Sequence, residues 1–242
     1  ENVAVDESHL LWKGRLSFRQ FIRIKRACFG IKSYILSEST SGYIWKLILY
    51  CGNETEIQQR PDCGHATNVV LTLLDGLENK GYKVFVDNYY CSPELALELS
   101  KVKTDVVGTV CANRKNVPKD LAKMKLKKGE MSAMYDVSGK MGCVKWMDKR
   151  EVMCLSTVHP LGTVEVQRRG KQVVVPSVID AYNRLMGGVD RVDQMLSAYP
   201  VERKRLKRWY KKEFRHLINM CVFNAHVLHS KNGGKLTLYE FR

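Results

Sequence analysis

Four aspartates are the residues of this 242-residue chain whose types and positions best suit chemistry. Asp6 follows the apolar run at residues 3–5, and Asp87 follows a similar run at residues 84–86. Burying an unpaired carboxylate is costly because it loses its hydration. If both runs are parallel neighbouring strands, the two carboxylates lie at the carboxyl edge of one sheet, where open α/β sheets bind ligands.

A third acid comes from Asp190 or Asp193, which are three residues apart and therefore share one face of a helix. The preceding pair, Gly187 and Gly188, has no side chains and lets such a helix approach a sheet closely. Neighbouring carboxylates repel one another unless a cation lies between them. Oxygen-only ligands of this kind select Mg²⁺ or Mn²⁺.

A purely structural role explains the same aspartates equally well. Acids after strands commonly cap turns, because their side chains accept hydrogen bonds from nearby backbone amides. Asp190 and Asp193 could also pair with Arg184 or Arg191 on a solvated helix face. From the residues alone, both interpretations stay open.

The charge of the chain favours a polyanionic partner. Lys and Arg number 40 and Asp and Glu 25, a net charge of +15, which favours nucleic acid over an anionic membrane. The longest apolar runs are strand-sized, so we expect no membrane span. Eight scattered cysteines without a Cys-x-x-Cys pair indicate free thiols rather than a zinc or disulfide framework.

A basic segment at residues 203–212 contains seven Lys and Arg and no acid. Cations that neutralise phosphates release counterions, and an aromatic side chain among them offers a surface for stacking. We therefore predict that the following residues bind DNA: Arg203, Lys204, Arg205, Lys207, Arg208, Trp209, Lys211 and Lys212. The alternatives are a solvated helix face or a nuclear import signal. For Trp209, packing within the fold is favoured over insertion between bases.

Hydrophobic periodicity predicts strands at the start of the chain, then helices that alternate with strands, and helices again at the end. The expected strands include residues 3–12, 29–37, 43–51, 82–86 and 106–110, of which the first three form a meander. The first expected helix follows Thr67, a possible N-cap, and stops at Lys80-Gly81, and the second begins at Pro93. A third follows Pro176 and is interrupted at Gly187-Gly188, and the last covers Leu206 to Leu228. We thus predict an α/β core in two parts, residues 1–110 and 173–242, with a small, mostly β insertion at residues 111–172.

Several short motifs occur along the chain in a fixed order. They are Val5-Asp6-Glu7 with Trp12-Lys13-Gly14-Arg15, Phe29-Gly30-Ile31-Lys32, Val86-Asp87-Asn88-Tyr89-Tyr90-Cys91-Ser92, Val107-Gly108-Thr109-Val110, and Tyr182-Asn183-Arg184-Leu185-Met186-Gly187-Gly188-Val189-Asp190 continuing to Asp193-Gln194-Met195. Together these motifs resemble those of the piggyBac transposases and the piggyBac-derived proteins of animal genomes. They occur in family order and cover nearly the whole chain.

The resemblance implies a ribonuclease-H-like mixed sheet flanked by helices, with the insertion before the last helices. It implies that Asp6, Asp87 and Asp190 bind two Mg²⁺ (or Mn²⁺) ions, with Asp193 as a further required acid. The implied activity is a DDD-type DNA transposase, in which two-metal phosphoryl transfer excises DNA and joins it at TTAA sites. The implied partners are the transposon ends and the target DNA, and the implied location is the nucleus.

Departures from the family pattern shape what we expect of this chain. The stretch at residues 24–27 and the Glu38-Ser39 pair differ from the usual family residues, but both lie away from the acids. Family members also carry an N-terminal DNA-binding and dimerising region and a C-terminal zinc domain. We therefore expect a fragment that dimerises, if at all, through regions outside it, binds DNA weakly without sequence preference and does not transpose alone. The alternative is a domesticated, non-catalytic module for DNA binding or protein interaction.

Overall fold

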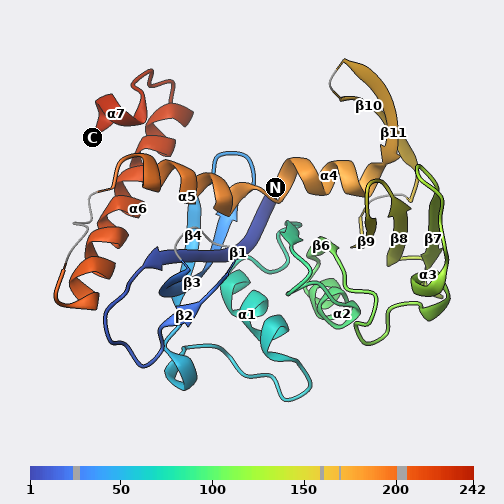
Figure 1. Cartoon of the computed structure of the whole chain (residues 1–242), viewed down its shortest axis with the longest axis horizontal. Coiled ribbons are helices and arrows are strands. Elements are labelled where there is room, and N and C mark those ends of the chain that lie inside the picture. Colours follow the sequence, from blue (N-terminus) through green and yellow to red (C-terminus); the bar gives the residue numbers. More distant parts are fainter. Residues whose placement is uncertain (24–27, 159–160, 169, 201–205) are drawn as a thin grey trace. The chain divides into compact units, whose positions relative to one another are not determined.

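The computed structural model describes residues 1–23, 28–158, 161–168, 170–200 and 206–242 (Figure 1). These residues form two compact units. The first unit comprises residues Glu1–Ala4 and Gln58–Met186, and the second comprises Val5–Ile57 and Gly187–Arg242. The chain therefore passes between the units three times: within its first strand, between Ile57 and Gln58, and between Met186 and Gly187.

Strands and helices alternate from residue 65 to residue 123, between a first group of four strands and a later run of five strands that leads to the last four helices. The strands are β1 (Asn2–Leu11), β2 (Gln20–Phe21), β3 (Phe29–Glu38), β4 (Ile44–Leu49), β5 (Lys83–Val86), β6 (Asp105–Thr109), β7 (Met131–Tyr135), β8 (Gly142–Met147), β9 (Glu151–Ser156), β10 (Thr163–Arg168) and β11 (Lys171–Pro176). The helices are α1 (His65–Leu74), α2 (Pro93–Lys101), α3 (Lys119–Lys123), α4 (Ser177–Leu185), α5 (Gly188–Ala198), α6 (Trp209–Lys231) and α7 (Leu238–Phe241), with a 3₁₀ turn at Gly52–Glu54.

The first unit contains a mixed sheet. Strand β5 pairs in parallel with β6, while β6, β9, β8 and β7 pair in that order with antiparallel neighbours. The first residues of β1 join this unit, where the amide of Lys83 donates to the carbonyl of Glu1 over 2.9 Å. Helix α4 packs on the sheet through Val178 and Ile179, which share a core cluster with Phe85. Strands β10 and β11 form a separate antiparallel hairpin.

The second unit is built on β3, which has β1 as a neighbour and pairs antiparallel with β2 and β4. The hairpin between β3 and β4 closes where the amide of Glu38 donates to the carbonyl of Tyr43 over 2.8 Å. Its core joins Ile35 of β3 to Val192 of α5 and Phe223 of α6, all buried. The expected hairpin is thus confirmed.

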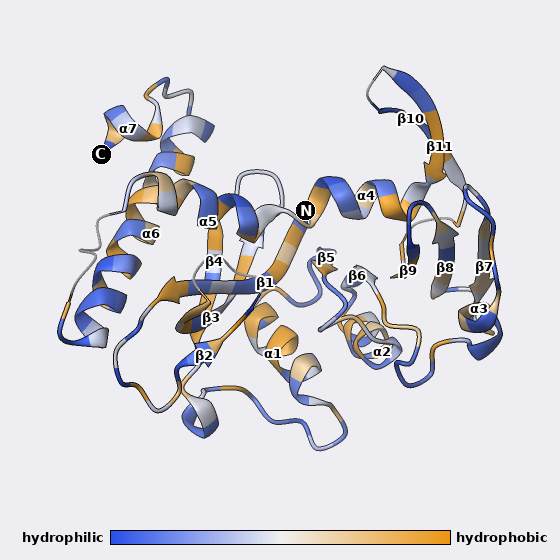
Figure 2. Ribbon diagram, viewed as in Figure 1, coloured by the Kyte–Doolittle hydropathy of each residue, from blue (hydrophilic) through white to orange (hydrophobic). Residues whose placement is uncertain are grey.

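Hydropathy follows these elements (Figure 2). Helix α1 is hydrophobic over most of its length, and its residues from Thr67 to Leu74 are all buried. Helix α6 is mixed, because only part of its surface packs against the second unit's core. Among the described residues, none of the helices combines the length and apolar character needed to cross a membrane.

The ends of two expected helices differ from the structure. Helix α1 begins at His65 with Gly64 as its N-cap, not at Thr67, because the Gly64 amide donates to the carboxylate of Glu94 over 2.9 Å. It also ends at Leu74, before the expected stop. The last long helix begins and ends three residues later than expected. The predicted division of the chain between residues 172 and 173, which both lie in β11, stays a prediction.

Candidate functional site

Asp6 lies in the interior of β1 rather than at the strand's end, so that expectation was wrong. The strand continues because β3 supports it further along: a Cβ on Gly30 would lie 2.2 Å from the carbonyl oxygen of Leu10, an approach only glycine allows. The Asp6 side chain is half-buried, and its Oδ1 accepts the amide of Glu7 over 2.8 Å.

A hydrogen bond joins β1 to α5 in the second unit. The hydroxyl of Ser8 donates to Oδ1 of Asp193 over 2.5 Å, across 185 residues of sequence. Residues two apart on a strand point to the same face, so the face of β1 that carries Asp6 also carries Ser8 and meets α5. Asp193 is half-buried, and Asp190 lies exposed in the first turn of the same helix.

Gly188 allows α5 to lie this close to the end of β3. A Cβ on Gly188 would lie 2.7 Å from Oγ of Ser37 and 2.9 Å from the carbonyl oxygen of Glu38. A Cβ on Gly187 would meet nothing within 4 Å. The close approach expected from the glycine pair is therefore confirmed, and Gly188 alone requires it.

Asp87 directly follows β5 in the first unit and organises the turn after it. Its Oδ1 accepts the amides of Tyr89 and Tyr90 over 2.9 and 3.4 Å, and its carbonyl accepts the amide of Cys91 over 2.9 Å. The turn-capping role expected as an alternative is therefore present. Capping also fixes the orientation of this half-buried carboxylate.

Two of the charged residues in the alternative ion pairs have contacts that the structure defines. Arg184 pairs with Asp180 on its own helix, with Nε 2.9 Å from Oδ2. Asp193 accepts the hydroxyl of Ser8, so this acid of α5 contacts a strand. The expected pairing of Asp190 or Asp193 with an arginine stays a prediction.

The donor chemistry of the four aspartates fits a hard divalent cation, because carboxylates supply oxygen ligands only. Asp6, Asp190 and Asp193 belong to the second unit and Asp87 to the first. Among the described residues, no group of three or more His, Cys, Asp or Glu side chains is arranged to hold a metal ion.

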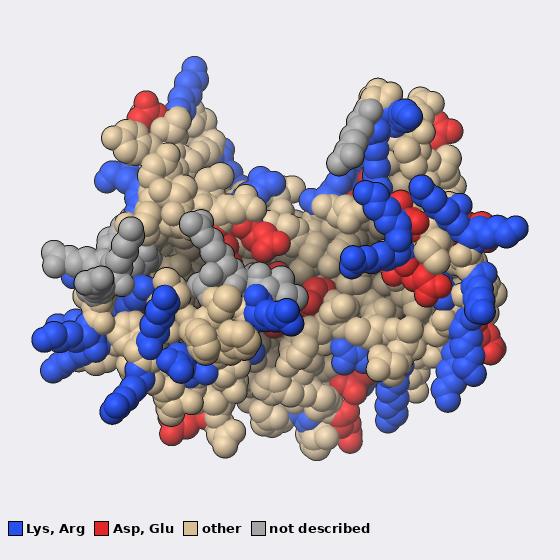
Figure 3. Space-filling view, in the orientation of Figure 1, with Lys and Arg blue, Asp and Glu red and all other residues tan. Residues whose placement is uncertain are grey.

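The basic segment is described from residue 206 onward, so the predictions for Arg203, Lys204 and Arg205 lie outside the described residues. Lys207, Arg208 and Lys211 are exposed at the start of α6. Figure 3 shows Lys and Arg side chains gathered over this helix and, separately, over the strands of the first unit.

Two members of the segment have structural contacts instead. The ammonium of Lys212, which is 6% exposed, donates to the carbonyl of Leu11 over 2.7 Å. Lys212 therefore turns inward, which corrects its assignment as a DNA contact. The ring of Trp209 packs edge-on against Phe18 with centroids 5.2 Å apart, the packing role favoured from the sequence.

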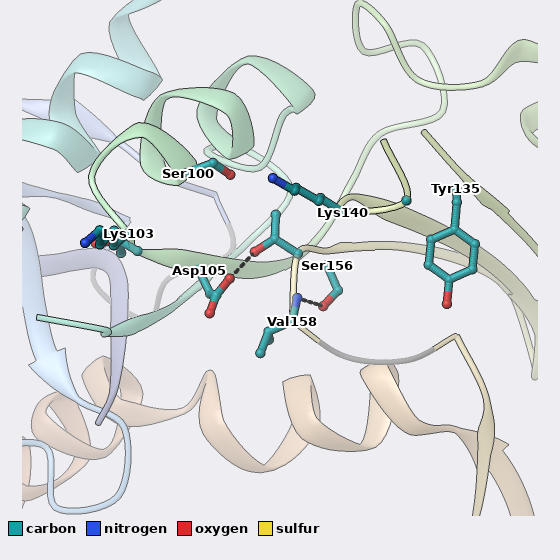
Figure 4. A pocket seen from close by; sticks show the side chains of 10 residues that line it. Ser100, Lys103, Asp105, Tyr135, Lys140, Ser156 and Val158 are labelled. Carbon is teal, nitrogen blue, oxygen red and sulfur yellow. Dashed lines mark hydrogen bonds between the residues drawn. The ribbon is translucent and has the colours of Figure 1, made fainter. Parts of the chain in front are cut away.

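A cavity of about 530 Å³ lies in the first unit, and none of the four predicted acids lines it (Figure 4). Ten residues line it: Ser100, Lys103, Thr104, Asp105, Tyr135, Gly139, Lys140, Ser156, Thr157 and Val158. Its polar groups largely satisfy one another, since Asp105 accepts the Thr157 hydroxyl over 2.9 Å and Ser156 accepts the Val158 amide over 3.2 Å.

Sequence reasoning missed two side chains that support the acids, Ser8 and Arg114. Ser8 had a readable signal, because it lies two residues from Asp6 on a predicted strand and so shares its face. Arg114 contacts the turn after Asp87 from 26 residues away, and no spacing rule points to it.

Comparison with known proteins gives consistent matches. The family described as "Transposase IS4" matches residues 1–226. The chain is similar to human "PiggyBac transposable element-derived protein 3", with 29% identity over 98% of this chain and 42% of that protein. It is similar to human "PiggyBac transposable element-derived protein 2", with 26% identity over 95% of this chain and 40% of that protein.

A solved structure, the cryo-EM structure of a piggyBac transposase synaptic complex with hairpin DNA, is similar in fold. The TM-score is 0.86 at 26% identity, over 99% of this chain and 50% of the other. This match confirms the ribonuclease-H-like α/β fold, a mixed sheet flanked by helices. The chain spans half or less of the length of these relatives.

Proposed function

This chain belongs to the IS4 transposase family, within its piggyBac group, and we propose on that premise that it is the catalytic domain of a piggyBac-like DNA transposase. The observation that carries the proposal is the contact between Ser8 and Asp193. It sets α5, which also bears Asp190, against the face of β1 that bears Asp6.

The four aspartates are proposed to hold two Mg²⁺ or Mn²⁺ ions, with Asp6, Asp87 and Asp190 as the triad and Asp193 as the further acid. When bound, such ions activate a water or 3′-hydroxyl nucleophile and neutralise charge on the phosphate. The chain's own part is to hold the carboxylates: amides of Tyr89 and Tyr90 orient Asp87, and the hydroxyl of Ser8 orients Asp193.

DNA is the proposed substrate, with TTAA as the proposed target. The +15 charge and the exposed cations Lys207, Arg208 and Lys211 support an attraction to phosphates. The solved relative is a complex with hairpin DNA. We also propose a nuclear location and a homodimer that forms through regions outside this chain, and we propose that this chain alone binds DNA without sequence preference.

A strand-cleavage assay tests this function. The full protein that carries this chain is incubated with pre-nicked terminal-repeat DNA, with Mg²⁺, with Mn²⁺ or with a chelator. Asp87→Asn should abolish cleavage and strand transfer while leaving DNA affinity nearly intact, because it removes one ligand charge and little volume. The matched control is Asp62→Asn, an exposed aspartate that is not one of the four proposed ligands and should cleave normally.

Two outcomes would contradict the proposal. If Asp87→Asn still cleaves DNA, Asp87 is not required for the reaction. DNA binding without cleavage under any divalent ion, by the wild-type protein, would instead support the alternative of a domesticated, non-catalytic module.

A further inference from the structure

Arg114 holds the turn that follows Asp87, from a loop beyond the next strand. Its Nη2 donates to the carbonyl of Asn88 over 2.5 Å and to the carbonyl of Tyr89 over 2.9 Å. All of these residues belong to the first unit. Hydrogen bonds from a guanidinium to carbonyls are charge-assisted, and therefore stronger than neutral ones.

The two carbonyls belong to the same peptide groups whose amides hold the carboxylate of Asp87. The Asn88 carbonyl shares a planar peptide unit with the amide of Tyr89, and the Tyr89 carbonyl shares one with the amide of Tyr90. Both of those amides donate to Oδ1 of Asp87. Arg114 therefore donates to the carbonyl oxygen of each peptide group, while the amide of the same group donates to the Asp87 carboxylate.

This arrangement has two physical consequences. A cation at the carbonyl oxygen polarises the peptide group and strengthens the donation of its amide, as expected for a chain of hydrogen bonds. Because peptide groups are planar, holding the oxygens also fixes the direction of the amides. Both effects act on Asp87 through the two peptide groups that hold its carboxylate.

Arg114 is half-buried, and the burial of its Nε supports a dedicated role. Its Nε is buried and has no hydrogen-bond partner among the described residues, an arrangement that ordinarily costs stability. A side chain on the surface for phosphate binding alone would keep this group in water. Its neighbour Lys115 is exposed.

We propose that Arg114 is a positioning residue for Asp87, which orients and polarises the two peptide groups that hold this carboxylate. The catalytic consequence rests on the proposed function, in which Asp87 is a metal ligand. The structural part does not, because it concerns only the turn.

Hydrogen exchange at the amides of Tyr89 and Tyr90, followed by NMR without metal or DNA, tests the structural part. Arg114→Met should speed exchange at these amides by about tenfold to a hundredfold, as expected for loss of a charge-assisted hydrogen bond. Arg114→Lys should largely restore protection, since one nitrogen makes both contacts. Lys115→Met, the matched control, should exchange like wild type. If Arg114→Met does not fold, Arg114→Gln, which lacks the charge, replaces it.

Cleavage by the full protein tests the catalytic part. Arg114→Met should raise the Mg²⁺ concentration for half-maximal cleavage by about tenfold or more, at unchanged DNA affinity and with rescue in Arg114→Lys. Unchanged amide exchange in Arg114→Met would overturn the proposal. A fall in DNA affinity with unchanged exchange would do the same and would make Arg114 a phosphate contact. If wild type does not cleave, the exchange result still decides the role of Arg114, and only the proposed function fails.

Discussion

Replacing Gly188 by serine should destabilise the second unit, whereas the same replacement at Gly187 should not. A Cβ at residue 188 would lie 2.7 Å from Oγ of Ser37 and 2.9 Å from the carbonyl oxygen of Glu38, well inside the 3.4 Å at which ordinary contact begins. The hydroxyl of Ser37 belongs to a side chain and can rotate, but the carbonyl belongs to a paired strand. Helix α5 must therefore shift away from β3.

The expected cost is that of overpacking a well-filled interior, about 1–3 kcal/mol. Better helix propensity of serine than glycine offsets this by only a few tenths of a kcal/mol. At Gly187, the N-cap of α5, a new Cβ meets nothing within 4 Å, and serine is a favoured N-cap residue. Gly187→Ser should therefore be neutral or slightly stabilising.

Denaturant unfolding of the two variants, with wild type alongside, measures this difference. Gly188→Ser should lower the free energy of unfolding by about 1–3 kcal/mol relative to Gly187→Ser, which corresponds to about 2–12 °C in melting temperature for a chain of this size. Equal stability of the two variants would refute the reasoning, because it would mean that α5 does not need the close approach seen at Gly188.

Three further predictions concern buried and charged groups. Burial raises the pKa of Cys143 to about 11 and of Cys154 to about 12 from 9.0, so unfolding releases their protons above about pH 9. The free energy of unfolding should therefore fall as pH rises from about 9 to 12. It should fall less steeply in Cys154→Ala, and a pH dependence equal to that of wild type in this variant would contradict the prediction. Lys145→Met should lower the free energy of unfolding, measured with denaturant, by about 1–3 kcal/mol. The reason is that the buried ammonium of Lys145 donates to two carbonyls at the end of α3 over 2.8 and 2.6 Å. In gel shifts at two salt concentrations, Lys211→Ala should reduce the salt slope of DNA binding by about 1. Lys212→Ala should leave that slope unchanged and lower the melting temperature instead. A reduced slope with an unchanged melting temperature would mean that Lys212 contacts DNA after all.

Elements with local end signals were predictable from the sequence. Helix α2 begins at Pro93 as expected, and its cap is Ser92, whose Oγ accepts the amide of Leu95 over 3.0 Å. The break between α4 and α5 falls at Gly187, as the glycine pair predicted. In each case a cap, proline or glycine within a few residues decides where the helix starts or stops.

Features fixed by distant residues were not predictable in the same way. The cap of α1 is Gly64 rather than Thr67 because Glu94, 30 residues away, accepts the Gly64 amide. Lys212 looked like part of a cationic run, yet it turns inward to a carbonyl 201 residues away in sequence. Composition and periodicity describe faces and segments, and they carry no information about which long-range partner a particular side chain meets.

The same distinction bears on how the four aspartates should be read. Their residue types and strand or helix positions were visible in the sequence, but their orientation depends on Ser8 for Asp193 and on Arg114 for the turn around Asp87. A relative that kept all four acids and lost either support would still match the family motifs while holding its carboxylates less firmly. If the proposed roles of Ser8 and Arg114 are right, the four acids together with these two residues should distinguish an active transposase from a domesticated copy better than the acids alone. The test compares cleavage by relatives that keep all four acids and differ at the positions of Ser8 and Arg114. Relatives that keep both residues should cleave DNA more strongly than relatives that have lost one of them.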